Sequence, residues 1–201
     1  MGIALAALGG LYGFVGGATL LGRLRIAKAR PCAIGELPER AMRRIAGRIR
    51  AVGEPLRAPL TGRACVGFVA EVLSDFEPGR FRESGAIEFV IEDDSGTAIV
   101  EAQRAQLELE PVTTGACGRA DATAAEAALF ARRRRGKPTR LQDWTFREAV
   151  IEAGALVEVI GSGEREPDPT MPLGGAGVYR EMPTRMRLVA RRGYPLVVRP
   201  A

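Results

Sequence analysis

Residues 89–100 read Phe-Val-Ile-Glu-Asp-Asp-Ser-Gly-Thr-Ala-Ile-Val, with apolar runs on both sides of an acidic turn that contains glycine. Asp, Ser and Gly are turn-forming residues, and the flanking β-branched residues favour strands. The stretch predicts a β-hairpin in which 86–91 and 97–102 are the strands. Asp94 and Gly96 then lie in the turn.

Further short strands are expected on both sides of this hairpin, because the apolar residues keep a period of about two. The expected strands are 45–52, 64–73, 146–152, 155–161, 185–191 and 194–198. Gly154 and Gly193 are turn residues, and 53–62 and 162–177 are loops rich in Pro and Gly. Thr123 and Glu126 form a capping-box pair, so a helix is expected over about 124–135. The pattern predicts a mainly β (α+β) fold, a small OB-like β-barrel with one inserted helix.

The composition excludes several kinds of chemistry. The chain has 201 residues, enough for one domain with an appendage, and it contains no histidine. Catalytic triads and zinc sites that use histidine are therefore excluded. Three cysteines, Cys32, Cys65 and Cys117, are too few and too widely spaced for a zinc cluster or a disulfide framework. We expect no metal and no cofactor.

The amino terminus predicts a membrane anchor. Residues 1–22 carry no charge, and a helix of that length crosses a hydrocarbon core of about 30 Å. The positive residues follow the apolar run, whereas a cleaved signal peptide carries them before it. An uncleaved, single-pass transmembrane helix is expected, then a basic juxtamembrane linker at 23–44 and a globular domain at 45–201. The positive-inside rule places that domain on the cytoplasmic side. The basic flank consists of Arg23, Arg25, Lys28 and Arg30.

Glycines in this segment follow a helical spacing. Gly9, Gly13 and Gly17 fall at i, i+4 and i+8, the small-residue pattern of helices that associate in lipid. We expect a homo-oligomer through this face as one use of the segment.

The net charge of +5 comes almost wholly from arginine, and its clusters suggest an anionic partner. Besides the basic flank, four consecutive arginines end the expected helix. One interpretation is that these arginine clusters are ordinary solvent-exposed surfaces. The other is that they bind anionic membrane headgroups or nucleic acid. Nucleic acid is disfavoured because aromatic residues make up only 5% of the chain, leaving few platforms for stacking bases. The four arginines are Arg132, Arg133, Arg134 and Arg135.

Three stretches, 54–65, 89–100 and 148–161, together resemble the GIDE domain family. This family includes the membrane-adjacent domain of a mitochondrial membrane-anchored E3 ubiquitin ligase and many bacterial proteins. With the preceding apolar segment, the resemblance covers roughly residues 1–165. The residues that carry it are Pro59, Leu60, Gly62, Cys65, Asp94, Gly96, Glu148, Gly154 and Gly161.

The resemblance implies a membrane-apposed domain that recognises a partner. In the eukaryotic ligase, ubiquitin transfer depends on a RING domain that binds zinc through Cys and His. The present chain has no histidine and no cysteine beyond Cys117, so it cannot form that RING. A label of ubiquitin-protein transferase would therefore rest on the family name alone.

Two other patterns resemble catalytic motifs. Asp94-Ser95-Gly96-Thr97 fits the signature of aspartic proteases, but the acids before Asp94 indicate an exposed turn. Cys65, between alanine and valine, is typical of a small buried hydrophobe. We therefore expect no catalytic residues and favour a non-catalytic interaction module that binds a protein partner or an anionic membrane surface. An OB-like nucleic-acid binder is the alternative.

Overall fold

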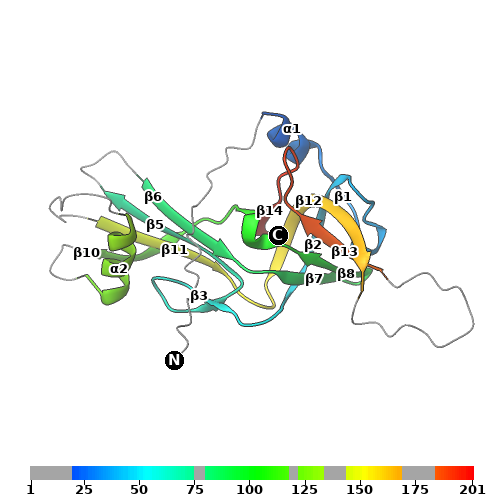
Figure 1. The fold of residues 1–201 in the computed structure, drawn as a ribbon. Helices are drawn as coiled ribbons and strands as arrows, with labels where there is room; N and C mark the ends of the chain where they lie inside the picture. The colour runs from blue at the N-terminus through cyan, green and yellow to red at the C-terminus, as the bar shows by residue number, and fades with distance from the viewer. Residues whose placement is uncertain (1–19, 75–79, 118–121, 134–143, 169–183) are drawn as a thin grey trace, which may run out of the picture.

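A computed structural model of the 201-residue chain describes residues 20–74, 80–117, 122–133, 144–168 and 184–201. The described part is mainly β, as the sequence predicts, and its largest sheet closes into a five-stranded barrel (Figure 1). The barrel strands are β2 (Met42–Ala51), β7 (Phe89–Asp93), β8 (Gly96–Val100), β12 (Leu156–Pro167) and β13 (Thr184–Val189).

The barrel order is β2-β7-β8-β13-β12, and β12 pairs back onto β2. The β8–β13 pair is parallel and the other pairs in the ring are antiparallel. Closure removes the two free edges that an open sheet would leave. Three short strands extend this sheet beyond the ring, and they are β1 (Arg30–Pro31), β9 (Gln106–Leu107) and β14 (Val197–Pro200).

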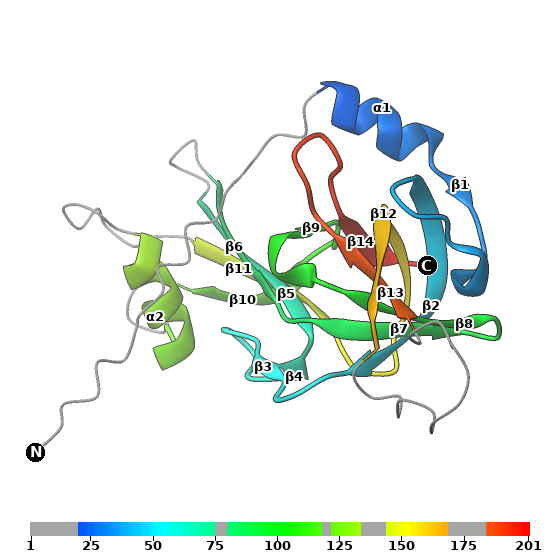
Figure 2. The same cartoon turned by 45° about the vertical axis from the view of Figure 1, so that its right-hand side comes forward.

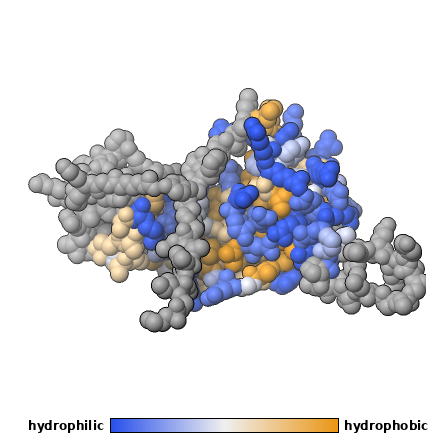
Figure 3. All heavy atoms as spheres, viewed as in Figure 1, coloured by the Kyte–Doolittle hydropathy of each residue, from blue (hydrophilic) through white to orange (hydrophobic). Residues whose placement is uncertain are grey.

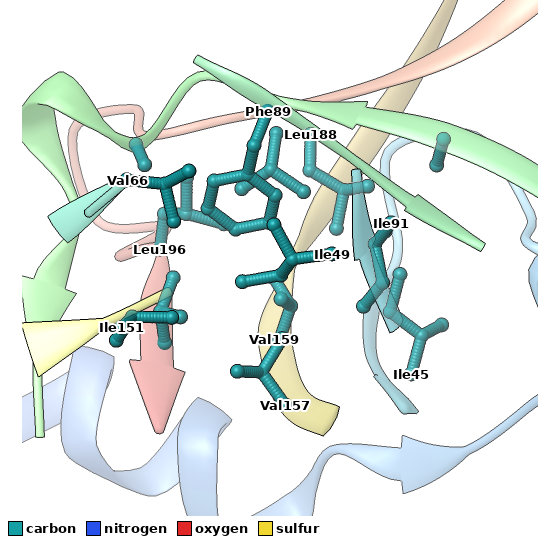
Figure 4. Close-up of a cluster of buried hydrophobic side chains, with 14 of the residues drawn as sticks. Ile45, Ile49, Val66, Phe89, Ile91, Ile151, Val157, Val159, Leu188 and Leu196 are labelled. Carbon is teal, nitrogen blue, oxygen red and sulfur yellow. The ribbon is translucent and has the colours of Figure 1, made fainter. Parts of the chain in front are cut away.

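Alternating side chains of the barrel strands fill its interior. Phe89 and Ile91 of the predicted hairpin point inward and are almost completely buried (Figure 4). The hairpin itself is confirmed, with Asp93 paired to Gly96 at its end. The residues that close around Phe89 include Ile49, Val66, Ile151, Val159, Leu188 and Leu196.

Two insertions into the barrel build a second sheet. The first lies between β2 and β7 and contributes β5 (Gly67–Ser74) and β6 (Arg80–Ala86). The second lies between β8 and β12 and contributes β10 (Val112–Cys117) and β11 (Trp144–Ile151). They pair in the order β10-β11-β5-β6, with β11 and β5 in register over eight residues (Figure 2). Sequence periodicity predicted β5 and β11 but missed β6 and β10.

One face of this second sheet carries its own core. Helix α2 (Ala124–Arg133) and the hairpin of β3 (Leu56–Arg57) with β4 (Ala64–Cys65) contribute to that core. The capping box is confirmed, because the Thr123 N–H donates to the Glu126 carboxylate and the Glu126 N–H donates to Thr123 Oγ1. The helix therefore begins where the sequence predicts. The core residues are Ala58, Cys65, Phe68, Ala70, Val72, Leu129, Trp144 and Phe146.

Residues 23–44, expected as a linker, are part of the folded unit. Helix α1 (Leu20–Lys28) leads into β1, and the 3-10 turn η1 (Ile34–Glu36) follows. Ala29 and Ile26 pack on Ile160 and Val197 of the barrel, while Ile34 and Leu37 are buried in its main core. Within the described residues, no helix is both long and apolar enough to span a bilayer. The expected span lies almost wholly in residues 1–19, outside the described part.

Strand β12 runs further than the sequence indicated. Residues 162–167, expected as the start of a loop, continue the strand and pair with β13. Gly161 lies inside this strand because there is no room for a side chain. A Cβ atom at this position would lie 2.6 Å from Leu196 Cδ1. Glycine is needed for close packing at this position and does not mark the strand's end. A second 3-10 turn, η2 (Ala102–Arg104), follows β8.

Candidate functional site

Part of the set of residues that carries the family resemblance lies at one buried carboxylate. Glu148, on β11, is 4% exposed, and its Oε1 accepts the Leu60 N–H at 2.8 Å. Its Oε2 accepts the Thr61 N–H at 3.1 Å and the Thr61 hydroxyl at 2.5 Å. The carboxylate thus satisfies two backbone donors of the turn that follows Pro59. Glu148 holds the β3–β4 hairpin onto the second sheet.

Three other residues of that set have structural roles nearby. Cys65 is 1% exposed, and its Sγ donates to the Leu56 carbonyl at 3.8 Å across the same hairpin. Gly62 and Gly154 have φ angles of +68° and +84°, which favour glycine. The Gly154 N–H donates to the Ile49 carbonyl and so ties the β11–β12 turn to the barrel. These residues of the family-like stretches therefore stabilise the fold.

A second carboxylate, Asp93, organises the β7–β8 turn. It accepts the Ser95 N–H and hydroxyl, the Gly96 N–H and, from a distant part of the chain, the Ile34 N–H at 3.0 Å. Burial alone would raise the pKa of Asp93, but these hydrogen bonds outweigh it and lower the pKa below the ordinary value. Asp94, singled out in the sequence, is exposed. Asp93 and Ser95, which accepts the Gly35 N–H at 2.9 Å, together bind η1 to the hairpin.

Neither described thiol is activated for nucleophilic chemistry. Burial raises the pKa of Cys65, and the nearby Glu148 and Glu152 carboxylates raise it further. Burial also raises the pKa of Cys32, although Arg43 partly opposes it. A reactive cysteine needs a lowered pKa, so these two side chains act as packing residues. Among the described residues, no group of three or more Cys, Asp or Glu side chains is placed to hold a metal ion.

The basic flank, which lies on α1 and at the start of β1, divides into two parts. Arg25 faces the barrel: its guanidinium donates to the Gly193 carbonyl and lies 4.1 Å from the ring centroid of Tyr194. Arg23, Lys28 and Arg30 are exposed. Leu21 and Leu24 are also exposed, at 64% and 47%, and apolar atoms appear beside basic ones at the α1 end of Figure 3. The sequence could not separate Arg25 from its neighbours, because only the fold brings 193–194 to it.

The predicted arginine run and the predicted glycine face lie at or beyond the ends of the described segments. Arg132 pairs with Glu83 at 3.0 Å and therefore holds α2 to β6. Arg133 ends α2, and Arg134 and Arg135 lie outside the described residues. The glycines of the apolar segment, Gly9, Gly13 and Gly17, also lie outside them.

A groove of about 1760 Å³ runs between the barrel and the second sheet. Its walls come from α1, β6, β11, the 104–110 segment and the end of β14. Apolar atoms are visible between α2 and the barrel in Figure 3. Arginine side chains and carboxylates both line the groove, and Arg82 spans it by donating to the Leu107 carbonyl at 2.8 Å. A mixed lining of this size suits a polypeptide better than a small ligand.

The outer face of the barrel carries an ion-pair network that joins β12 and β13 to Glu88, just before β7, and Glu101, just after β8. Arg187 contacts Glu88, Glu101 and Glu166, and Arg185 also pairs with Glu166. Burial alone would lower the pKa of Arg187, but the carboxylates outweigh it and raise the pKa. These guanidinium groups are already neutralised by protein carboxylates.

Comparison with descriptions of protein families, with curated proteins and with solved structures finds no match for this chain.

Proposed function

We propose that this protein is a single-pass, membrane-anchored, non-catalytic interaction module whose β-barrel lies on the cytoplasmic side. One observation carries the proposal: α1 is packed onto the barrel and directly continues the uncharged 1–22 segment. With no flexible spacer after α1, a bilayer that holds residues 1–19 also holds the barrel close to its surface. The first function of α1 is therefore to tether and orient the barrel.

The roles of the motif residues support a module without catalysis. Glu148 and Asp93 each bind several donors of the chain itself, and the Cys65 thiol is buried. General acid–base or nucleophilic chemistry needs such groups to face a substrate. Glu148 instead holds the β3–β4 hairpin onto the second sheet, and Asp93 holds η1 onto the barrel.

We further propose that the barrel is OB-like and that the chain is a GIDE-type domain without a RING. In chain order the barrel strands pair 1-2-3-5-4-1, with strands 3 and 5 parallel. This closed five-stranded arrangement supports an OB-like barrel.

Nucleic-acid binding is the less favoured function. The strands that form the binding face of an OB-fold correspond here to β7 and β8. Their outer face carries the Arg187 network, and the described residues of that face include no aromatic side chain for base stacking. A protein partner in the groove fits better, with self-association through the Gly9, Gly13 and Gly17 face as a second contact.

The test is carbonate extraction and protease accessibility of the full chain in native membranes. The proposal expects the protein in the carbonate-resistant pellet and the barrel cleaved only from the cytoplasmic side. A matched variant with two arginines replacing Leu11 and Val15 should become extractable. Release of the unchanged chain into the soluble fraction would overturn the anchor, and cleavage from the opposite side would overturn the orientation.

Proximity labelling of the tagged full chain in the same membranes then tests the partner. The proposal expects a labelled protein whose recovery falls when Val112, an exposed residue of the groove wall, is replaced by arginine. Equal recovery with both chains would exclude the groove as its binding site.

A further inference from the structure

The two sides of α1 differ in chemistry. Gly22, Ile26 and Ala29 are spaced i, i+4 and i+7 and face the barrel. Leu21, Leu24 and Lys28 are spaced i, i+3 and i+7 and face outward. The outer side of α1 therefore exposes two apolar side chains with a basic one at its end. Residues 20–30 contain four basic groups and no acid.

A turn from the other end of the chain lies against this helix. Residues 191–194 reverse the chain before β14, with mutual backbone hydrogen bonds between Arg191 and Tyr194 and Gly193 at φ +77°. Arg25 binds the Gly193 carbonyl and stacks on Tyr194, so the turn and α1 are fixed together. Figures 1 and 2 show the loop before β14 beside α1 in both views. Arg192, in this turn, is exposed.

We propose that the outer side of α1 and the 191–194 turn form one docking face for an anionic phospholipid bilayer. Lys28 and Arg192 bind headgroup phosphates, and Leu21 with Leu24 enter the apolar boundary beneath them. Arg25 is a positioning residue: it binds the turn and not the lipid. Arg192 is a new contact, distant in sequence from the expected basic flank.

Charge and continuity identify the bilayer as the occupant. Residues 20–30 and the 191–194 turn contain no acid of their own. Arg191 pairs with Glu164 of β12, so the charge complementary to an anionic surface comes from Lys28 and Arg192. The face also adjoins the uncharged 1–22 segment, which delivers it to a membrane. This inference rests on the proposed anchor, and it adds which side of the barrel faces the bilayer. In Figures 1 and 2, β3 lies on the side of the barrel away from α1.

Hydrogen–deuterium exchange of the full chain in nanodiscs tests the docking face. The discs contain phosphatidylcholine alone or with phosphatidylserine, and amides of 190–195 are followed. We expect slower exchange there in the phosphatidylserine discs. In the Arg192→Glu chain the protection of these amides against exchange should fall by at least about five-fold. This factor corresponds to about 1 kcal/mol for one basic residue near the surface. Arg57→Glu, on β3, is the matched control and should keep it.

Arg25→Gln separates positioning from lipid binding. It should speed exchange at 190–195 in both kinds of disc, whereas Arg192→Glu should act only where phosphatidylserine is present. A chain that inserts but shows equal exchange at 190–195 in both discs would overturn the docking face and leave the anchor standing. A chain that fails to insert into either disc would overturn the anchor as well.

Discussion

Replacing Glu148 tests whether the second sheet depends on one buried carboxylate. In Glu148→Gln the amide keeps the side chain's shape but exchanges an acceptor for a donor. One of the three donors at Leu60 and Thr61 then loses its acceptor inside the protein. Hydrogen bonds to a charged group are worth about 1.5–3 kcal/mol, so the free energy of unfolding should fall by about that amount. Glu148→Ala removes every acceptor and should cost more.

The single tryptophan provides the assay. Trp144 is 3% exposed, lies on β11 with Glu148 and packs in the core of the second sheet. Urea unfolding of the full chain in detergent, followed by Trp144 fluorescence, therefore reports on the affected region. Glu152→Gln is the matched control, because Glu152 pairs with Arg63 at the surface and such pairs contribute about 0–1 kcal/mol. Equal unfolding midpoints for the two variants would refute the role given to Glu148.

Three further predictions concern the barrel and its thiols. Asp93→Asn should lower the free energy of unfolding by about 1–3 kcal/mol at neutral pH, whereas Asp94→Asn should change it little. The difference in unfolding midpoint between Asp93→Asn and the unchanged chain should shrink below about pH 4. The sign follows because a carboxylate with a lowered pKa stabilises the folded state above its unfolded-state pKa and loses that effect as the pH falls. Gly161→Ala should cost about 1–3 kcal/mol through overpacking against Leu196, and adding Leu196→Val should recover part of the midpoint. Cys65 should resist maleimide until the protein unfolds, and labelling of the native chain, read by mass spectrometry, would contradict its burial.

The barrel strands were largely predictable from the sequence because period-two patterning marks a strand with one buried face. The β7–β8 hairpin and the start of α2 were set by local signals, an acidic turn with glycine and a capping box. Strands β6 and β10 were missed because their residues, Arg80–Ala86 and Val112–Cys117, lack that alternation. Their pairing with β5 and β11 places them in the sheet.

The candidate site was less predictable, because its contacts join distant segments. Asp93 binds Ile34 and Arg25 binds Gly193, pairs separated by 59 and 168 residues. In the sequence Asp93 looks like Asp94, and Arg25 looks like Arg23. Only the fold distinguishes them. The signal that could have pointed to the 191–194 turn was the run Arg-Arg-Gly-Tyr, a glycine turn next to basic and aromatic residues.

Site-specific photocrosslinking in native membranes tests the central claim that α1 holds one side of the barrel against a bilayer. A benzophenone amino acid replaces Leu24 on α1 or Arg57 on β3, one at a time, in the full chain. The account predicts lipid adducts at position 24 and none at position 57, because these positions lie on opposite sides of the barrel. Membrane-bound protein that forms lipid adducts at position 57 and none at position 24 would contradict it.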